Sequence, residues 1–314
     1  MKVDSLRRHP MVQVIFKFLF VVVTSTVLSS LLHSLTNIYF NTNSIKYWRP
    51  LDTWQDIGFL IGWRITELGL EWLAGYDSYD AVALGILSHG PPLDLLVTFY
   101  GVPPTAVLHP LLINSFVTYI SFRLVRPLSP PRMISSSRKD ARRVANCEIL
   151  QSTAVQLYIV FLAASVYTIV LFTAYKTYFP EYLVTYFNQI PNITAAYSPF
   201  YITKFPATIL VGLAAKTFIF TPAIATPNDE DCDFDTVTAS LWETLLYNIW
   251  GYSSKTKVVI KRTALLMIVS GMNTFLRTLK MIDGVEFTGA AIYSAIIILA
   301  FGITGTVLGL VAAF

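Results

Sequence analysis

The chain has 314 residues, of which 54% are hydrophobic and only 13% are charged, and its formal net charge at pH 7 is +4. A soluble globular domain carries about 25% charged residues, so this composition excludes an ordinary water-soluble protein. The small positive balance also argues against a nucleic-acid-binding surface, and we expect no nucleic-acid partner. With only two cysteines, the chain is not a disulfide-rich scaffold.

Six long apolar runs predict membrane-spanning helices, because about 20 helical residues cross the hydrocarbon core of a bilayer. We therefore expect an all-α integral membrane protein in which residues 1–314 form one helical bundle and the lipid bilayer is the main partner. The predicted spans are Val12–Leu32, Thr105–Val125, Thr153–Ala174, Pro206–Ala225, Val258–Leu276 and Phe287–Ala313.

The first span follows a short basic segment that contains Lys2, Arg7 and Arg8. Such a segment resembles the charged region of a secretory signal sequence. The run Val12–Leu32 has 21 residues, which is longer than a typical cleavable core, and no convincing small-residue cleavage site follows it. We predict a retained signal anchor.

Two further apolar segments, Ile57–Leu73 and Ala81–Gly101, are ambiguous. The first contains Arg64, Glu67 and Glu71 at a spacing that places them on one helix face, where a local salt-bridged face is the simplest interpretation. We predict an interfacial amphipathic helix followed by a re-entrant segment. If both segments cross the membrane, the bundle has eight spans and the orientation of the others is unchanged.

The second ambiguous segment contains the string His89-Gly90-Pro91-Pro92-Leu93-Asp94. Its histidine and aspartate have the His-x4-Asp spacing of glycerolipid acyltransferases, and the resemblance stops at these two residues. It implies that His89 would act as a general base and that Asp94 would orient it. The alternative is a helix that the two prolines break, with polar side chains capping the break.

Lysine and arginine favour the cytoplasmic side of membrane proteins. If the N-terminus lies inside, the inner segments hold 14 such residues and the outer segments hold 7, so we expect both termini to be cytosolic. The basic loop 126–150 is then an inner loop, and the sequon that begins at Asn192 lies on the outer side as a glycosylation site. Cys147 and Cys232 both face the reducing cytosol.

The fourth predicted span contains Lys216 near its middle. Ionisable residues within a span are candidates for function, although a lysine near the end of a span can extend to the headgroups instead. The following acidic cluster, Asp229 to Asp235, lacks the glycine and glutamate that a calcium-binding EF-hand requires, so we expect no metal and no cofactor. We predict that Thr236–Trp250 forms a helix on the inner membrane surface.

The last span carries Gly302, Gly305 and Gly309. Small residues let helices approach closely in lipid, so these glycines predict a helix-packing face. The face could contact another membrane protein or another helix of the same chain.

Three alternative functions are compatible with the sequence. The first is a non-enzymatic multi-pass protein of an internal membrane such as the endoplasmic reticulum, acting in membrane organisation, assembly or trafficking. The second is a membrane-embedded lipid-modifying transferase that uses His89 and Asp94. The third is a small transporter or channel with Lys216 on its path.

Overall fold

A computed structural model describes residues 10–40, 49, 53–129, 132, 152–188, 190–191, 193–194, 200–221 and 254–313. Over these residues the fold is all-helical, with no β-strand longer than an isolated bridge. Its helices are α1 (Pro10–Phe40), α2 (Trp54–Leu73), α3 (Ser78–Phe99), α4 (Pro104–Val125), α8 (Thr153–Lys176), α9 (Phe179–Tyr186), α10 (Phe200–Phe220), α12 (Ser254–Met281) and α13 (Phe287–Ala313).

The protein is a membrane helical bundle, since six of the described helices are long and apolar enough to span a bilayer. They are α1, α3, α4, α8, α12 and α13. Five of the six correspond to predicted spans. The sixth is α3, which overlaps the ambiguous segment Ala81–Gly101. The predicted span Pro206–Ala225 overlaps α10, whose described apolar part is Ala207–Phe220, and it stays a prediction.

The segment Ala81–Gly101 is not re-entrant, which corrects the sequence interpretation. Helix α3 runs without interruption through Pro91 and Pro92. Helix α2 also differs from expectation, because it buries Glu67 and Glu71 inside the bundle instead of presenting them to water at an interface. Cys147, Cys232 and Thr236–Trp250 lie outside the described residues.

Local sequence explains how α2 and α3 form a hairpin. Thr53 caps the start of α2 by accepting the N–H of Asp56, and Asp77 caps α3 by accepting the N–H groups of Tyr79 and Asp80. Between the two helices, Gly75 has a φ of 75°, a backbone conformation that glycine adopts without steric strain.

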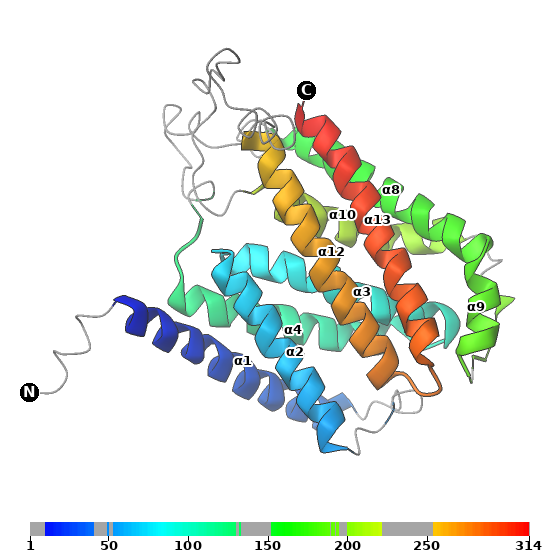
Figure 1. The fold of residues 1–314 in the computed structure, drawn as a ribbon, viewed down its shortest axis with the longest axis horizontal. Helices are drawn as coiled ribbons and strands as arrows, with labels where there is room; N and C mark the ends of the chain where they lie inside the picture. Colours follow the sequence, from blue (N-terminus) through cyan, green and yellow to red (C-terminus); the bar gives the residue numbers. More distant parts are fainter. Residues whose placement is uncertain are drawn as a thin grey trace, which may run out of the picture.

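Helix α12 lies between α13 and the α2–α3 hairpin, and α8 covers the other side of α13 (Figure 1). The three glycines of the last span all face α12: the neighbours of Gly302, Gly305 and Gly309 are Met267, Thr263 and Val259. A Cβ atom at Gly305 would lie 2.9 Å from the Cβ of Thr263, closer than real Cβ contacts allow. The described contact of this small-residue face is thus within the chain.

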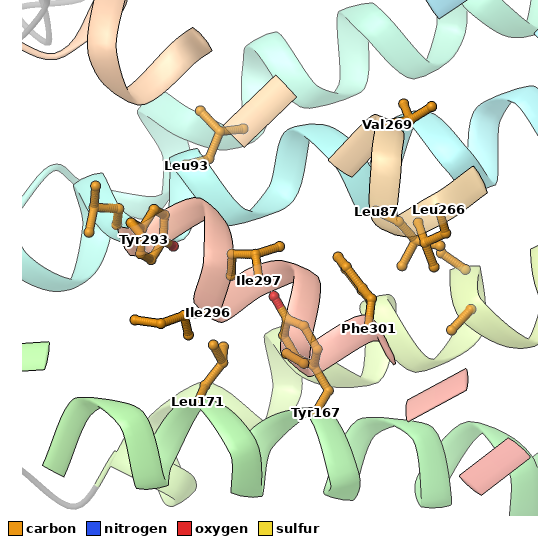
Figure 2. Close-up of a cluster of buried hydrophobic side chains, with 14 of the residues drawn as sticks. Leu87, Leu93, Tyr167, Leu171, Leu266, Val269, Tyr293, Ile296, Ile297 and Phe301 are labelled. Atoms are coloured by element: carbon orange, nitrogen blue, oxygen red, sulfur yellow. The ribbon is translucent and has the colours of Figure 1, made fainter. Parts of the chain in front are cut away.

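The centre of the bundle is apolar. Figure 2 shows Tyr167 and Leu171 of α8 pointing toward Ile296, Ile297 and Phe301 of α13, while side chains of α3 and α12 close the cluster from the other side. The rings of Tyr167 and Phe301 are stacked with their centroids 5.1 Å apart. This core sets the positions of α3 and α12, which carry much of the polar chemistry described below.

Candidate functional site

Helices α2 and α12 run antiparallel and contact each other through polar side chains at matching levels. At one end, Lys280 Nζ donates to Asp56 Oδ1 over 2.6 Å. Midway, the indole N–H of Trp63 donates to Asn273 Oδ1 over 3.2 Å. Toward the other end, the guanidinium of Arg262 lies 4.5 Å from the ring centroid of Tyr76, just beyond α2.

These contacts belong to a row of polar and ionisable groups at successive levels of the bundle, which we name the polar seam. Along α12 the seam extends from Arg262 to Lys280, which is about 27 Å at 1.5 Å per residue. The hydrocarbon core of a bilayer is about 30 Å thick. The seam consists of Asp56, Trp63, Arg64, Glu67, Glu71, Asp77, Asp80, Ser88, His89, Arg262, Asn273, Arg277 and Lys280.

Glu67 is the residue through which the polar side chains in the central part of the seam are hydrogen-bonded to one another; we call this the Glu67 junction. Its Oε2 accepts from Arg64 Nη1 over 2.7 Å, and its Oε1 accepts from the hydroxyl of Ser88 on α3 over 3.0 Å. The second Nη of Arg64 donates to Thr118 of α4 over 2.8 Å. The fully buried carboxylate of Glu67 therefore connects α2 to α3, and its partner Arg64 connects α2 to α4.

His89 lies next to this junction. Its Nδ1 is 2.9 Å from the carbonyl of Gly85, 2.9 Å from the hydroxyl of Ser88 and 3.7 Å from Glu67 Oε1. A proton on Nδ1 satisfies the Gly85 carbonyl and leaves Nε2 as an acceptor. Nε2 is buried and has no hydrogen-bond partner among the described residues.

Glu71 lies one helical turn beyond Glu67, toward Tyr76. Its side chain is completely buried, at 0% exposure, and neither carboxylate oxygen has a hydrogen-bond partner within the described part of the chain. Burial of an unpaired carboxylate is among the most unfavourable arrangements in a protein interior. Glu71 is therefore the most unusual group in the seam.

An ion-pair cluster closes the seam at its Asp80 end. Arg132 contacts both Asp77 and Asp80, with 2.7 Å between its Nη2 and Asp80 Oδ1. Arg262, only 3% exposed, donates to the other oxygen of Asp80 over 2.8 Å and to the carbonyl of Phe218 over 2.6 Å. These contacts hold the α2–α3 turn against the segment after α4, the end of α10 and the start of α12.

Outside the membrane-spanning segments, Asp77 shows the electrostatic effect of this cluster. Burial raises its pKa, but the guanidinium of Arg132 and the N–H groups of Ser129 and Asp80 lower it by more. The pKa of Asp77 consequently lies below its ordinary value, and the carboxylate is charged at neutral pH. The attraction of both aspartates raises the pKa of Arg132 despite burial.

His89 and Asp94 belong to different groups of contacts. Five residues of a continuous helix turn through about 500°, which places the two side chains about 140° apart around the axis. His89 contacts Glu67, whereas Asp94 accepts from Thr98 over 3.3 Å and interacts electrostatically with Tyr175 and Tyr293 of α8 and α13. This arrangement does not favour a catalytic pair, and the catalytic role stays a prediction.

The other predicted site residues are not part of the seam. Lys216 is half-buried and donates over 3.0 Å to Gln156, which lies in the first turn of α8. A lysine at that level can reach the headgroups, which favours the snorkelling interpretation. Asn192 lies outside the described residues, and Gly302, Gly305 and Gly309 serve the packing of α13 against α12.

The sequence predicted that Arg64, Glu67 and Glu71 share one helix face, but it did not predict what that face contacts. The only indication of a buried polar site was this charged face on an otherwise apolar helix. No spacing rule connects it to Asn273 or Arg262, some 200 residues later in the chain.

No known protein family matches this chain, and neither a characterised protein nor a solved structure was found to be similar to it.

Proposed function

We propose that this protein is a non-enzymatic transporter or channel in which small ions cross the bilayer along the polar seam. The observation that carries the proposal is the complete burial of Glu71 without a hydrogen-bond partner among the described residues. Ionisable groups inside membrane bundles commonly mark ion or proton pathways, because their burial is otherwise unfavourable. The path follows α2, α3 and α12 and does not pass Lys216.

The chemistry of the seam suits ions better than apolar solutes. Glu67, Glu71 and His89 are groups that can accept a cation or a proton, while Arg64 and Arg277 limit the net negative charge between them. The exchangeable groups Glu67, Ser88 and His89 follow one another at 3.0 Å and 2.9 Å. Such spacing lets a hydrogen-bonded chain pass charge between neighbouring helices.

A transferase would require His89 and Asp94 to act on one substrate, and their separate contacts give that function no specific support. Membrane organisation or assembly remains a proposal of the sequence alone. We also propose from the sequence that the protein resides in an internal membrane of the secretory pathway with both termini in the cytosol. The distribution of lysine and arginine supports the orientation, and the sequon that begins at Asn192 supports the secretory pathway.

Purified protein in liposomes tests the transport proposal. Vesicles would be loaded with K⁺, Cl⁻ and a pH-sensitive dye, and fluxes would be followed after imposing a gradient of each ion in turn. We expect at least one flux to exceed that of protein-free vesicles. The variant Glu67→Gln should reduce this flux by about tenfold or more, since loss of one ionic interaction in the path raises the barrier by about 1.4 kcal/mol or more.

The matched control is Glu181→Gln, which makes the same chemical change at an exposed position on α9. It should leave the flux unchanged. Fluxes equal to those of protein-free vesicles for all three ions, with correctly inserted and folded protein, would rule out the proposal.

A further inference from the structure

Among the described residues, no basic side chain forms an ion pair or hydrogen bond with the Glu71 carboxylate. The nearest basic group on its own helix is Arg64, seven residues earlier, which is about 10 Å along the axis. Arg64 is already engaged by Glu67 at 2.7 Å and by Thr118. Glu67 itself lies one turn away and would repel a second negative charge.

The other charged groups packed around α2 are also engaged elsewhere. Asp80 binds Arg132 and Arg262, and Arg126 donates to the carbonyls of Trp72 and Tyr76. On α12, Lys280 binds Asp56 and Arg277 donates to Asn273. The other titratable side chains described on α1, α3 and α12 are Lys17, His33, Tyr79, His89, Asp94, Lys257 and Lys261. Neither these nor Tyr76 forms a hydrogen bond with the Glu71 carboxylate.

A charged carboxylate in this position would be very unfavourable. Taking an ion out of water is strongly unfavourable unless a counter-ion and hydrogen bonds replace the lost hydration. A carboxyl group in such surroundings takes up a proton and becomes neutral. A metal cation would need several oxygen or nitrogen ligands, and within the described residues no group of three acidic, histidine or cysteine side chains could hold one.

We infer that Glu71 is a proton-binding site inside the bundle, and that the proton is the ion which the polar seam handles. Protonation of Glu71 does not depend on transport, whereas the role of the proton as the transported ion rests on the proposed function. Glu71 lies between the Glu67 junction and the Asp80 cluster, so a proton released there enters the seam between its centre and one end.

Infrared spectroscopy of the reconstituted protein tests the occupancy without any transport measurement. A protonated carboxyl group has a C=O stretch well separated from the bands of ionised carboxylates and of the peptide backbone. We expect this band in wild-type protein at pH 7, its loss in Glu71→Gln and its retention in Glu181→Gln. Equal bands in the wild type and in Glu71→Gln would overturn the inference.

The variant Glu71→Asp covers the case in which the glutamine variant does not fold. It keeps an acid but shortens the side chain by one methylene, which changes the surroundings of the carboxyl group. The band should then shift in frequency instead of disappearing. An unshifted band in folded Glu71→Asp would equally contradict the inference.

The pH dependence of stability gives a second readout. The folded state holds a proton on Glu71 that the unfolded chain loses above pH of about 4.3, so rising pH favours unfolding by about tenfold per unit. Between pH 5 and 8, Glu71→Gln should remove this pH dependence of the free energy of unfolding, which corresponds to about one bound proton. An unchanged pH dependence would show that Glu71 is ionised in the folded protein.

The experiments distinguish failure of the transport proposal from failure of the proton-site proposal. An acid band at pH 7 together with no flux in liposomes would leave the proton site in place and eliminate the transport function. A flux that Glu67→Gln reduces, without an acid band from Glu71, would preserve transport and eliminate the proton site. A flux of K⁺ or Cl⁻ with no proton flux would eliminate the proton as the transported ion.

Discussion

The side-chain amide of Asn273 donates a 2.7 Å hydrogen bond to the main-chain carbonyl of Ser88. This carbonyl lies four residues before Pro92, which has no N–H to donate to it. The hydroxyl of Tyr293 likewise donates to the carbonyl of Pro91 over 2.7 Å. The Asn273 amide thus replaces the N–H that Pro92 lacks, which helps the helix to continue through its prolines, while Tyr293 adds a second contact between α13 and the same part of α3.

This relationship makes Asn273 and Pro92 energetically coupled. Asn273→Leu should lower the free energy of unfolding by about 1–3 kcal/mol, because the buried carbonyl of Ser88 loses its donor. The loss should be smaller in a Pro92→Ala background, where the alanine N–H can replace the amide. Thermal or denaturant unfolding in detergent of the two single variants and the double variant measures the coupling. Strictly additive effects would show that the Asn273 bond does not compensate for the proline.

The Asp80 end of the seam should make stability sensitive to acid. Burial raises the pKa of Asp77 in the folded state, but the attraction of Arg132 and the hydrogen bonds to the carboxylate together lower it by more. The unfolded chain then binds more protons in acid, so this contribution is complete above a pH of about 4 and is lost as the pH falls through the folded-state pKa.

We therefore expect Asp77→Asn to be less stable than the wild type at pH 7, with a difference that narrows below pH of about 4. Unfolding curves from pH 7 to pH 3 test this, with Glu181→Gln as the exposed control. A difference that stays constant over the whole range would contradict the role of Asp77 in the ion-pair cluster.

The close approach of α13 to α12 predicts a strong effect at Gly305. Gly305→Ala places a Cβ atom against Thr263, and relief of this overlap requires the helices to separate. Overpacking of this kind costs about 1–3 kcal/mol. Gly58→Ala is the control, because a Cβ atom at Gly58 meets nothing within 4 Å and alanine favours a helix. Equal stability of the two variants would show that α12 and α13 are not packed as described.

The orientation proposed from the sequence is open to a direct test. We expect Asn192 to face the lumen and Cys147 and Cys232 to face the cytosol. An endoglycosidase-sensitive change in electrophoretic mobility should therefore be absent in Asn192→Gln. Modification of either cysteine by a membrane-impermeant thiol reagent added only to the lumenal side would reverse the orientation.

Local composition is enough to show that lipid is the solvent of this protein. Long apolar runs such as Thr153–Ala174 and Phe287–Ala313 can be recognised from local composition, because crossing the hydrocarbon core depends on the length and polarity of one segment. The periodicity that places Arg64, Glu67 and Glu71 on one face is also local. These features gave the helical membrane bundle and the charged face of α2.

The contacts of that face, and the continuation of α3 through its prolines, depend on how the helices pack together. The spacing of residues along one helix fixes their direction around its axis, but it does not say which distant helix lies opposite. Asn273 supplies a donor to Ser88, and Arg262 supplies a counter-ion to Asp80, from positions far along the chain. A polar or proline residue in lipid is stable only if such a partner is present, and that presence depends on how the whole bundle packs.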